Sequence, residues 1–443
     1  MSERTLTITG GQPIKGELTC FGAKNFATKA MVATTLGDSP STLTNVPPIG
    51  DVDITRALLV GAGVNCSEHS ETMTFDPSGM TSSTLTMPDS RNNRIPILLL
   101  PTLLHRFGEA HIPALGGCKI GNRNVDYHLE SARKFGAKVW QDEEGYHAKA
   151  DGRLKGAHIK LPYPSVGATE TTLFLSVLAE GTSVISNAAI EPEIVELVTM
   201  LRAMGAIIFM EEGREIRVEG VEKLSGTHMP ILGDRIEVGS WAALACAADG
   251  EITVHGIRAN TMSNFLSYFR QVGGGFDLIG PDSIRFYRER PLTSITLETD
   301  VFPGFSTDWQ QPFAVMLTQA EGISVIHETV YESRFGYTEA LKGLGADVQL
   351  TTHCLGKPCR FENHDYPHSA LIKGKVNLKA TSDFLEIPDL RAGLAYVIAA
   401  AVAEGDTTLT NIDMLERGYG PVRERLEAIG VKAVESTQMK KSA

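Results

Sequence analysis

The 443-residue chain is poor in several residue types, and each shortage argues against a class of protein. Aromatic residues make up only 7% of it, and its six cysteines lack the dense spacing of a secreted disulfide scaffold. Basic residues do not outnumber acidic ones, because the formal net charge is −12. We therefore expect free thiols in a reducing cytoplasm and no nucleic-acid partner. A small site could still gather arginines around an anionic ligand.

Long hydrophobic segments are also missing. The longest apolar runs, residues 95–104 and 392–403, are too short to span a bilayer. The opening residues MSERTLTITGG have neither the basic region nor the apolar stretch of a signal peptide. With 42% hydrophobic and 21% charged residues, the composition predicts a soluble globular protein without a membrane contact. Its length exceeds one ordinary hydrophobic core and predicts two or three domains.

Two glycine-centred patterns recur six times each, with a period of about 70 residues. In the first, an apolar helix ends at a glycine that precedes a β-branched strand. In the second, a helix ends at a glycine that precedes a strand of alternating polarity. The last interval is longer, which predicts an insertion at residues 351–385. The first pattern contains Gly37, Gly108, Gly181, Gly250, Gly322 and Gly405, and the second contains Gly61, Gly136, Gly205, Gly273, Gly345 and Gly430.

The helices before the first-pattern glycines are apolar nearly all round, so we expect each to be covered on every side, three in each domain. Helix N-termini attract anions, and six of them in one region would form an anion site. Thr307, Asp308 and Asp389 are possible N-caps. Lys24 and Arg94, by contrast, oppose the helix dipole, which indicates a functional reason for their position.

Ten stretches carry a resemblance that runs in order along nearly the whole chain. They are GAKN (22–25), GGCKIGNRNVDYH (116–128), DGRLKGAHI (151–159), SVGATET (165–171), NAAIEPEIVEL (187–197), GDRIEVGS (233–240), FSTDWQ (305–310), ETVYESRF (328–335), PDLRAG (388–393) and ERGY (416–419). Together they resemble the UDP-N-acetylglucosamine 1-carboxyvinyltransferases. These enolpyruvyl transferases begin peptidoglycan precursor synthesis.

The resemblance implies an α/β fold of two inside-out barrel domains. Each domain would consist of three βαβαββ-like repeats, with the active site in the cleft between the domains. One domain would span residues 24–232 and carry the loop with Cys118. The other would comprise residues 1–23 and 233–443 and carry Asp308, Arg334, Arg391 and Arg417.

The implied reaction adds the 3-hydroxyl of UDP-N-acetylglucosamine to C2 of phosphoenolpyruvate and then eliminates phosphate. By similarity, Cys118 protonates C3, and Asp308 takes or orients the hydroxyl proton. A thiol in a glycine-rich polar loop near Arg123 suits this role, because a neighbouring arginine lowers its pKa. Neither a cofactor nor a metal is implied, and the oligomeric state stays open.

The resemblance also assigns the remaining site residues. Lys24 and Arg417 are expected to act in catalysis with Cys118 and Asp308. The expected phosphoenolpyruvate ligands are Lys24, Arg94, Arg123, Arg334, Arg391 and Arg417. The expected UDP-N-acetylglucosamine ligands are Asn25, Arg94, Arg123, Asp126, His128, Ser165, Val166, Gly167, Thr307, Asp308 and Val330, and the supporting carboxylates are Glu191, Asp234 and Asp389.

Three positions near the nucleotide end depart from the family pattern: Asn124, Tyr163 and Ile190. A transferase acting on another nucleotide, such as uridine monophosphate, therefore stays an alternative. A shikimate 3-phosphate enzyme of the same fold is a further alternative, against which the cysteine loop argues. A non-catalytic binder of phosphorylated sugars is the third, against which Cys118 and Asp308 argue.

The insertion contains four residues that could ligate zinc, namely Cys354, Cys359, His364 and His368. Their spacing is only loosely that of a zinc finger, and the resembling family needs no metal. The sequence therefore favours a solvated loop, with a structural metal site as the alternative.

Overall fold

The chain crosses twice between two folding units in the structure, a computed structural model that describes residues 2–87, 93–116, 125–354 and 359–439. Unit 1 contains the described residues of 1–21 and 233–443, and unit 2 contains the described residues of 22–232. The chain thus begins in unit 1, passes through the whole of unit 2 and returns.

Unit 2 has three small sheets in its described residues, with strand orders β13-β3-β5-β4, β11-β12-β10-β9 and β6-β8-β7. Its helices are α1 (Lys24–Thr34), α2 (Gly50–Gly61), η1 (Pro77–Gly79), η2 (Ile95–Leu99), α3 (Leu100–Phe107), α4 (Asp126–Lys134), α5 (Val166–Ser176) and α6 (Pro192–Ala203). Its strands are β3 (Ser41–Thr44), β4 (Asn65–His69), β5 (Thr72–Asp76), β6 (Glu109–Pro113), β7 (Lys138–Gln141), β8 (Gly145–Lys149), β9 (His158–Lys160), β10 (Thr182–Ser186), β11 (Ile207–Glu211), β12 (Glu215–Glu219) and β13 (His228–Pro230).

Unit 1 repeats this plan, with described sheets of order β21-β22-β1-β23, β15-β16-β14-β2 and β17-β18-β20-β19. Its helices are α7 (Arg235–Ala247), η3 (Ala259–Met262), α8 (Ser263–Val272), α9 (Thr307–Leu317), α10 (Thr338–Gly343), α11 (Leu390–Val402), α12 (Ile412–Tyr419) and α13 (Val422–Ala428). Its strands are β1 (Ser2–Gly10), β2 (Lys15–Thr19), β14 (Glu251–His255), β15 (Gly274–Leu278), β16 (Ser283–Arg288), β17 (Thr296–Glu298), β18 (Gly322–His327), β19 (Asp347–Thr351), β20 (Ser369–Gly374), β21 (Leu385–Glu386), β22 (Gly405–Thr410) and β23 (Lys432–Met439).

The sheets share one pairing scheme. In a typical repeat, the strand after the first-pattern glycine pairs in parallel with one neighbour and antiparallel with another, as β10 does with β9 and β12. The sixth repeat is completed by the two ends of the chain, because β1 pairs antiparallel with both β22 and β23. The N-terminal strand β1 therefore takes the place between two strands that β12 takes between β10 and β11.

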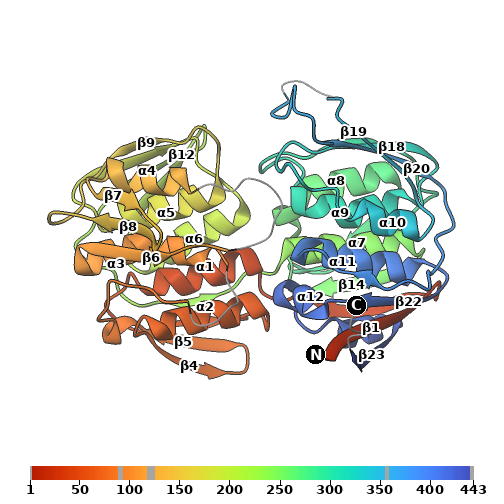
Figure 1. The fold of residues 1–443 in the computed structure, drawn as a ribbon, viewed down its shortest axis with the longest axis horizontal. Coiled ribbons are helices and arrows are strands. Elements are labelled where there is room, and N and C mark those ends of the chain that lie inside the picture. The colour runs from red at the N-terminus through yellow and green to blue at the C-terminus, as the bar shows by residue number, and fades with distance from the viewer. Residues whose placement is uncertain (1, 88–92, 117–124, 355–358, 440–443) are drawn as a thin grey trace. The chain divides into compact units, whose positions relative to one another are not determined.

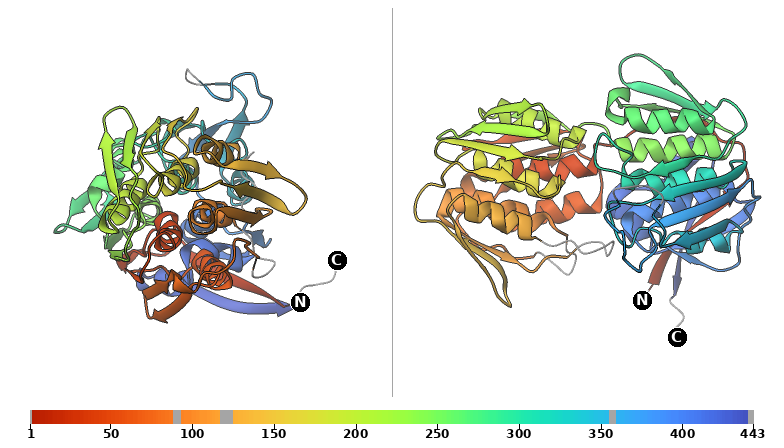
Figure 2. Two further views of the ribbon diagram at one scale, coloured as in Figure 1. Left: turned by 90° about the vertical axis from the view of Figure 1, so that its left-hand side faces the viewer. Right: turned by 90° about the horizontal axis from the view of Figure 1, so that it is seen from above.

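Apolar helices form the centre of each unit, as the sequence predicts. Every residue of α7 is buried, and so is α11 from Leu390 to Ala401. Figure 1 shows α7, α9 and α11 side by side in unit 1, and the left view of Figure 2 shows helices of unit 2 nearly end-on. The predicted α/β class with threefold repetition is confirmed. Across the described residues, none of the helices combines the length and hydrophobicity needed to cross a bilayer.

Two local predictions are wrong. The glycine that caps the second helix of the first repeat is Gly63, whose φ is 96°, whereas Gly61 is the last residue of α2. A left-handed φ after the C-cap favours glycine, and the sequence LVGAGV offers two candidates. The helix expected to start at Arg94 begins as the 3-10 segment η2 and becomes α-helical only at Leu100.

Candidate active site

Asp308 lies between two arginines at the start of α9 in unit 1. Its oxygen Oδ2 lies 3.1 Å from Nε of Arg391, and its Oδ1 accepts a hydrogen bond from Nη2 of Arg334. Arg334 comes from the connection after β18, and Arg391 from the first turn of α11. Segments distant in sequence therefore converge on one carboxylate, and two predicted phosphoenolpyruvate ligands lie beside the predicted acceptor of the hydroxyl proton.

Both arginines are buried, with 2% of Arg334 and 7% of Arg391 exposed. Burial opposes a guanidinium charge, but the neighbouring acidic groups, Asp308 foremost among them, together outweigh it, so the pKa of each arginine is raised. Nε and Nη1 of Arg334 have no hydrogen-bond acceptor among the described residues. Buried donors without acceptors are costly. This arrangement can therefore donate hydrogen bonds to an added anion.

Tyr419 extends the cluster from the end of α12. Its hydroxyl accepts a hydrogen bond from Nη1 of Arg391 at 3.3 Å, and burial raises the pKa of Tyr419 to about 12. The phenol therefore stays protonated at neutral pH and fixes Arg391 without adding charge. Arg417, a predicted phosphate ligand, lies two residues earlier in α12 and is half-buried.

Glu328 organises the predicted sugar-binding residues, and the sequence analysis gave it no role. It is fully buried and accepts hydrogen bonds at 2.9 Å from the hydroxyl of Thr307 and from the amide of Gln310. Its other oxygen accepts the backbone N–H groups of Val330 at 2.7 Å and Tyr331 at 3.0 Å. One carboxylate thus holds Thr307 and Val330 in one place. Its position at the start of ETVYESRF, directly after a strand, was the available signal.

Two of the predicted supporting carboxylates are helix N-caps. Asp234 accepts the backbone N–H groups of Ile236 and Glu237 in α7. Asp389 accepts those of Arg391 and Ala392 in α11, at 2.9 and 3.0 Å.

The N-cap of α9 is neither Thr307 nor Asp308, so that prediction is wrong. Ser306 caps the helix instead, through a 3.3 Å hydrogen bond from the Asp308 backbone N–H. The Asp308 carboxylate is therefore available for the arginines.

Unit 2 has its own ionic cluster at the start of α1. Lys24 is the first residue of this helix, and its Nζ lies 2.8 Å from Oδ2 of Asp51, which is 5% exposed. Asp51 was not predicted as a site residue. It is the second residue of α2, where a carboxylate also suits the helix dipole.

A second pair, half-buried Lys29 and buried Glu170, lies between α1 and α5 and was also missed. Nζ of Lys29 lies 4.0 Å from Oε1 of Glu170. Burial lowers the pKa of Lys29 and raises the pKa of Glu170 to about 7. Glu191 and Glu193 add to the shift of Glu170. Glu191, the residue before α6, was predicted as a supporting carboxylate.

The structure brings together two of the segments predicted to bind the nucleotide. Buried His128, in α4, hydrogen-bonds through Nδ1 to the hydroxyl of Thr171 in α5 at 2.7 Å. Gly167 packs so closely that an added Cβ would lie 3.1 Å from Cε1 of His128. Ser165 caps α5 by accepting the N–H of Ala168 at 3.4 Å. Asp126, at the start of α4, is exposed.

The remaining predicted residues are distributed through unit 2. Asn25 follows Lys24 in α1, Val166 begins α5 and Arg94 precedes η2. The altered residues Tyr163 and Ile190 are half-buried. Three predicted or altered residues, Cys118, Arg123 and Asn124, lie outside the described residues.

The fold and sequence of this chain match a known family. The profile of the family described as EPSP synthase (3-phosphoshikimate 1-carboxyvinyltransferase) matches residues 8–426. The enolpyruvyl transferase NikO from Streptomyces tendae superposes with a TM-score of 0.86 at 22% identity, over 99% of this chain and 100% of that one. The chain therefore belongs to the EPSP synthase family.

Two relatives show which kind of enzyme within the family this chain is similar to. A protein of Protochlamydia amoebophila is 44% identical over 434 residues, covering 96% of this chain and 93% of the relative. A protein of Chlamydia pneumoniae is 44% identical over 431 residues, covering 96% and 93%. Both are named UDP-N-acetylglucosamine 1-carboxyvinyltransferase. The resemblance seen in the motifs is confirmed.

Proposed function

We propose that this enzyme transfers the enolpyruvyl group of phosphoenolpyruvate to the 3-hydroxyl of UDP-N-acetylglucosamine, in the cytoplasm and without a cofactor. The observation that carries the proposal is the contact of Asp308 with two buried arginines, of which Arg334 has donors that no described residue accepts. A carboxylate beside anion-binding groups is what this reaction needs. The name of the relatives at 44% identity supplies the acceptor.

In the proposed addition step, a bond forms between the 3-oxygen and C2 of phosphoenolpyruvate, while C3 gains a proton. The substrate carboxylate resembles the side chain of Asp308, so both can use the same arginines. Hydrogen bonds and positive charge keep a carboxylate ionised and weakly basic. When the substrate carboxylate takes donors of Arg334 and Arg391, Asp308 is held less tightly and can accept the hydroxyl proton.

In the proposed elimination step, C3 loses a proton and the bond from C2 to the phosphate oxygen breaks, which releases phosphate. Lys24, Arg123 and Arg417 are the proposed phosphate ligands, and Arg94 adds positive charge. We assign the proton on C3 to Cys118 by family resemblance, as the sequence analysis does. A positioned general acid contributes roughly 10²–10⁴-fold to a rate.

The proposed contacts of the acceptor follow the family resemblance. Thr307 and Val330, both held by Glu328, are the proposed contacts of the N-acetylglucosamine part, together with Asn25. The His128 and Ser165–Gly167 group is the proposed contact of the uridine diphosphate, with Asp126 at its edge. The altered residues Tyr163 and Ile190 belong to this end, so the nucleotide acceptor needs a direct test.

Phosphate release from phosphoenolpyruvate, measured with three acceptors in parallel, tests the proposal. UDP-N-acetylglucosamine should give the highest kcat/KM, and uridine monophosphate and shikimate 3-phosphate should give little release. A preference for uridine monophosphate would replace the proposed acceptor and retain the chemistry. Release with none of the three would contradict the proposal.

A further inference from the structure

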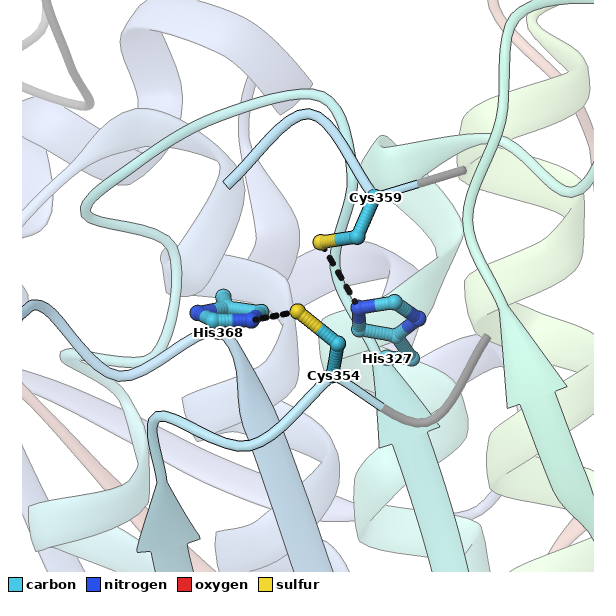
Figure 3. Close-up of side chains that lie close together, drawn as sticks. All are labelled: His327, Cys354, Cys359 and His368. Carbon is cyan, nitrogen blue, oxygen red and sulfur yellow. Dashed lines mark hydrogen bonds between the residues drawn. The ribbon is translucent and has the colours of Figure 1, made fainter. Parts of the chain in front are cut away.

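Four side chains of unit 1 meet at one end of a sheet (Figure 3). They are His327, Cys354, Cys359 and His368, and their potential ligand atoms all lie within 4.8 Å of one another. His364 was predicted as a member of this set, but it is exposed and His327 takes its place. The expectation of a solvated loop is also wrong for Cys359 and His368, which are buried.

Sheet register explains why these residues converge. His327 ends β18, Cys354 follows β19, and His368 directly precedes β20. Both β18 and β19 run antiparallel to β20, so His327 and Thr351 lie opposite the same residue, Ser369. The ends of β18 and β19 and the start of β20 therefore lie at the same end of the sheet. Cys359 comes from the connection between β19 and β20.

The distances suit one tetrahedral ion. Sγ of Cys354 lies 3.3 Å from Nε2 of His368, and Sγ of Cys359 lies 3.4 Å from Nε2 of His327. Zinc bonds of about 2.3 Å to sulfur and about 2.0–2.1 Å to nitrogen place tetrahedral ligand atoms roughly 3.3–3.8 Å apart. Two sulfurs and two imidazole nitrogens are a common donor set for structural zinc.

The second nitrogen of each imidazole already has an acceptor. Nδ1 of His327 lies 2.7 Å from Oε2 of Glu298, and Nδ1 of His368 lies 3.1 Å from the backbone oxygen of Tyr366. When these nitrogens carry the protons, both Nε2 atoms present lone pairs toward the sulfurs. Histidines that bind metals are usually held in this way by a carboxylate or carbonyl. The backbone N–H of Phe361 also donates to Sγ of Cys359 at 3.3 Å, which favours a thiolate.

Burial makes these contacts informative. Only 1% of His327 and of His368 is exposed, yet the partner of each Nε2 is a thiol, which is a weak hydrogen-bond donor. Buried polar atoms normally have better partners. We propose that His327, Cys354, Cys359 and His368 bind one Zn²⁺ ion as a structural site. Both thiols lose their protons to solvent as the metal binds, and four protein ligands leave no position for substrate.

The proposed zinc would join three strands and the insertion. It would also fix the end of β18, where His327 immediately precedes Glu328, the residue that holds Thr307 and Val330. This role is separate from the transferase reaction, because no step of that reaction uses the ion. The proposed zinc site and the proposed transferase reaction can therefore fail independently of each other.

Metal content of the full-length protein, purified without chelators, tests the site. Elemental analysis should find about one zinc per chain, and Cys354→Ser, Cys359→Ser and His327→Ala should each lower it to below about a tenth. His364→Ala and Cys66→Ser are matched controls and should keep the zinc. Zinc that persists in the ligand variants, or its absence from the wild-type protein, would overturn the proposal.

A second measurement does not depend on variants that fold. Removal of the metal from wild-type protein by a chelator should lower Tm, and re-addition of Zn²⁺ should restore it. Co²⁺ added instead should give the visible absorption of a tetrahedral site with thiolate ligands. An unchanged Tm together with no tetrahedral cobalt spectrum would contradict the site. So would a disulfide between Cys354 and Cys359 found by mass spectrometry in freshly purified protein.

Discussion

The ionic cluster around Asp308 in unit 1 differs from the lysine–carboxylate pairs of unit 2. In unit 1, the carboxylate of Asp308 contacts the guanidinium groups of both Arg334 and Arg391. In unit 2, half-buried lysines meet buried carboxylates in pairs, Lys24 with Asp51 and Lys29 with Glu170. The first arrangement leaves donors of Arg334 without an acceptor in the part of the chain that the structure describes. In the second, burial lowers the pKa of Lys29 and raises the pKa of Glu170.

The two arrangements of charge are expected to have different consequences. The arginines that bind the carboxylate of Asp308 can bind a substrate carboxylate in its place and stay paired with a negative charge. This arrangement suits a substrate that is itself a carboxylate. A buried one-to-one pair costs desolvation energy and is often neutral for stability. Unit 1 is therefore expected to respond to substitution mainly in catalysis, and the Lys29–Glu170 pair mainly in pH-dependent stability.

Asp308→Asn should have the largest effect. The amide keeps the shape of the side chain but cannot take the hydroxyl proton, so kcat in the phosphate-release assay should fall by roughly 10²–10⁴-fold. Asp383→Asn, at an exposed position of the same unit, is the control and should be unchanged. An Asp308→Asn enzyme within about threefold of wild type would exclude the proposed role.

Arg334→Lys should have the next largest effect. Lysine keeps the charge but lacks the guanidinium fork that can serve Asp308 and a substrate carboxylate together. Losing one or two charge-assisted hydrogen bonds should raise KM for phosphoenolpyruvate by about 10–100-fold, with a smaller change in kcat. Arg423→Lys, on the surface of α13, is the matched control. If KM stayed unchanged while kcat fell, Arg334 would not bind the substrate carboxylate.

Glu170→Gln should change how stability depends on pH. Burial raises the pKa of Glu170 to about 7 in the folded state from an ordinary value near 4.5. Between pH 5 and 7 the folded state therefore holds a proton that the unfolded state has released, and stability falls as pH rises. The free energy of unfolding, from urea titrations at pH 5 and pH 7, should fall less in the variant than in wild type.

Exposed Glu222 provides the control for this experiment, since Glu222→Gln should keep the wild-type slope. Equal slopes in wild type and Glu170→Gln would show that the Lys29–Glu170 pair does not titrate as described.

Asp389→Ala should have the smallest effect. It removes the N-cap of α11 and should lower the free energy of unfolding by about 1 kcal/mol. Asp389→Ser keeps a capping oxygen and should recover most of this loss. If both variants were equally destabilised in urea titrations, the carboxylate would act through charge rather than through capping.

The repeated fold was predictable because its signals are local. Apolar helices and glycine-terminated helix ends lie within short windows, and each recurs six times. What failed was the choice between neighbouring residues of the same type, as with Gly61 and Gly63, or between adjacent capping residues, as with Ser306 and Thr307. Local geometry decides such choices, and the sequence offers several residues able to satisfy it.

The candidate site was predictable only through resemblance to a family. Motifs identify Asp308, Arg334 and Arg391, but nothing in their spacing shows that they share one ion-pair cluster. Partners from other elements were missed altogether, such as Asp51 for Lys24 and His327 for the cysteines of the insertion. These contacts depend on helix packing and strand register, which bring together residues far apart in sequence.

The most direct test of the proposed reaction measures both products at once. The full-length protein, phosphoenolpyruvate and UDP-N-acetylglucosamine are incubated together, and released phosphate and the mass of the nucleotide sugar are followed in the same samples. We predict one phosphate for each nucleotide sugar that gains an enolpyruvyl group. Phosphate released without that gain in mass, or neither product at all, would contradict the assignment.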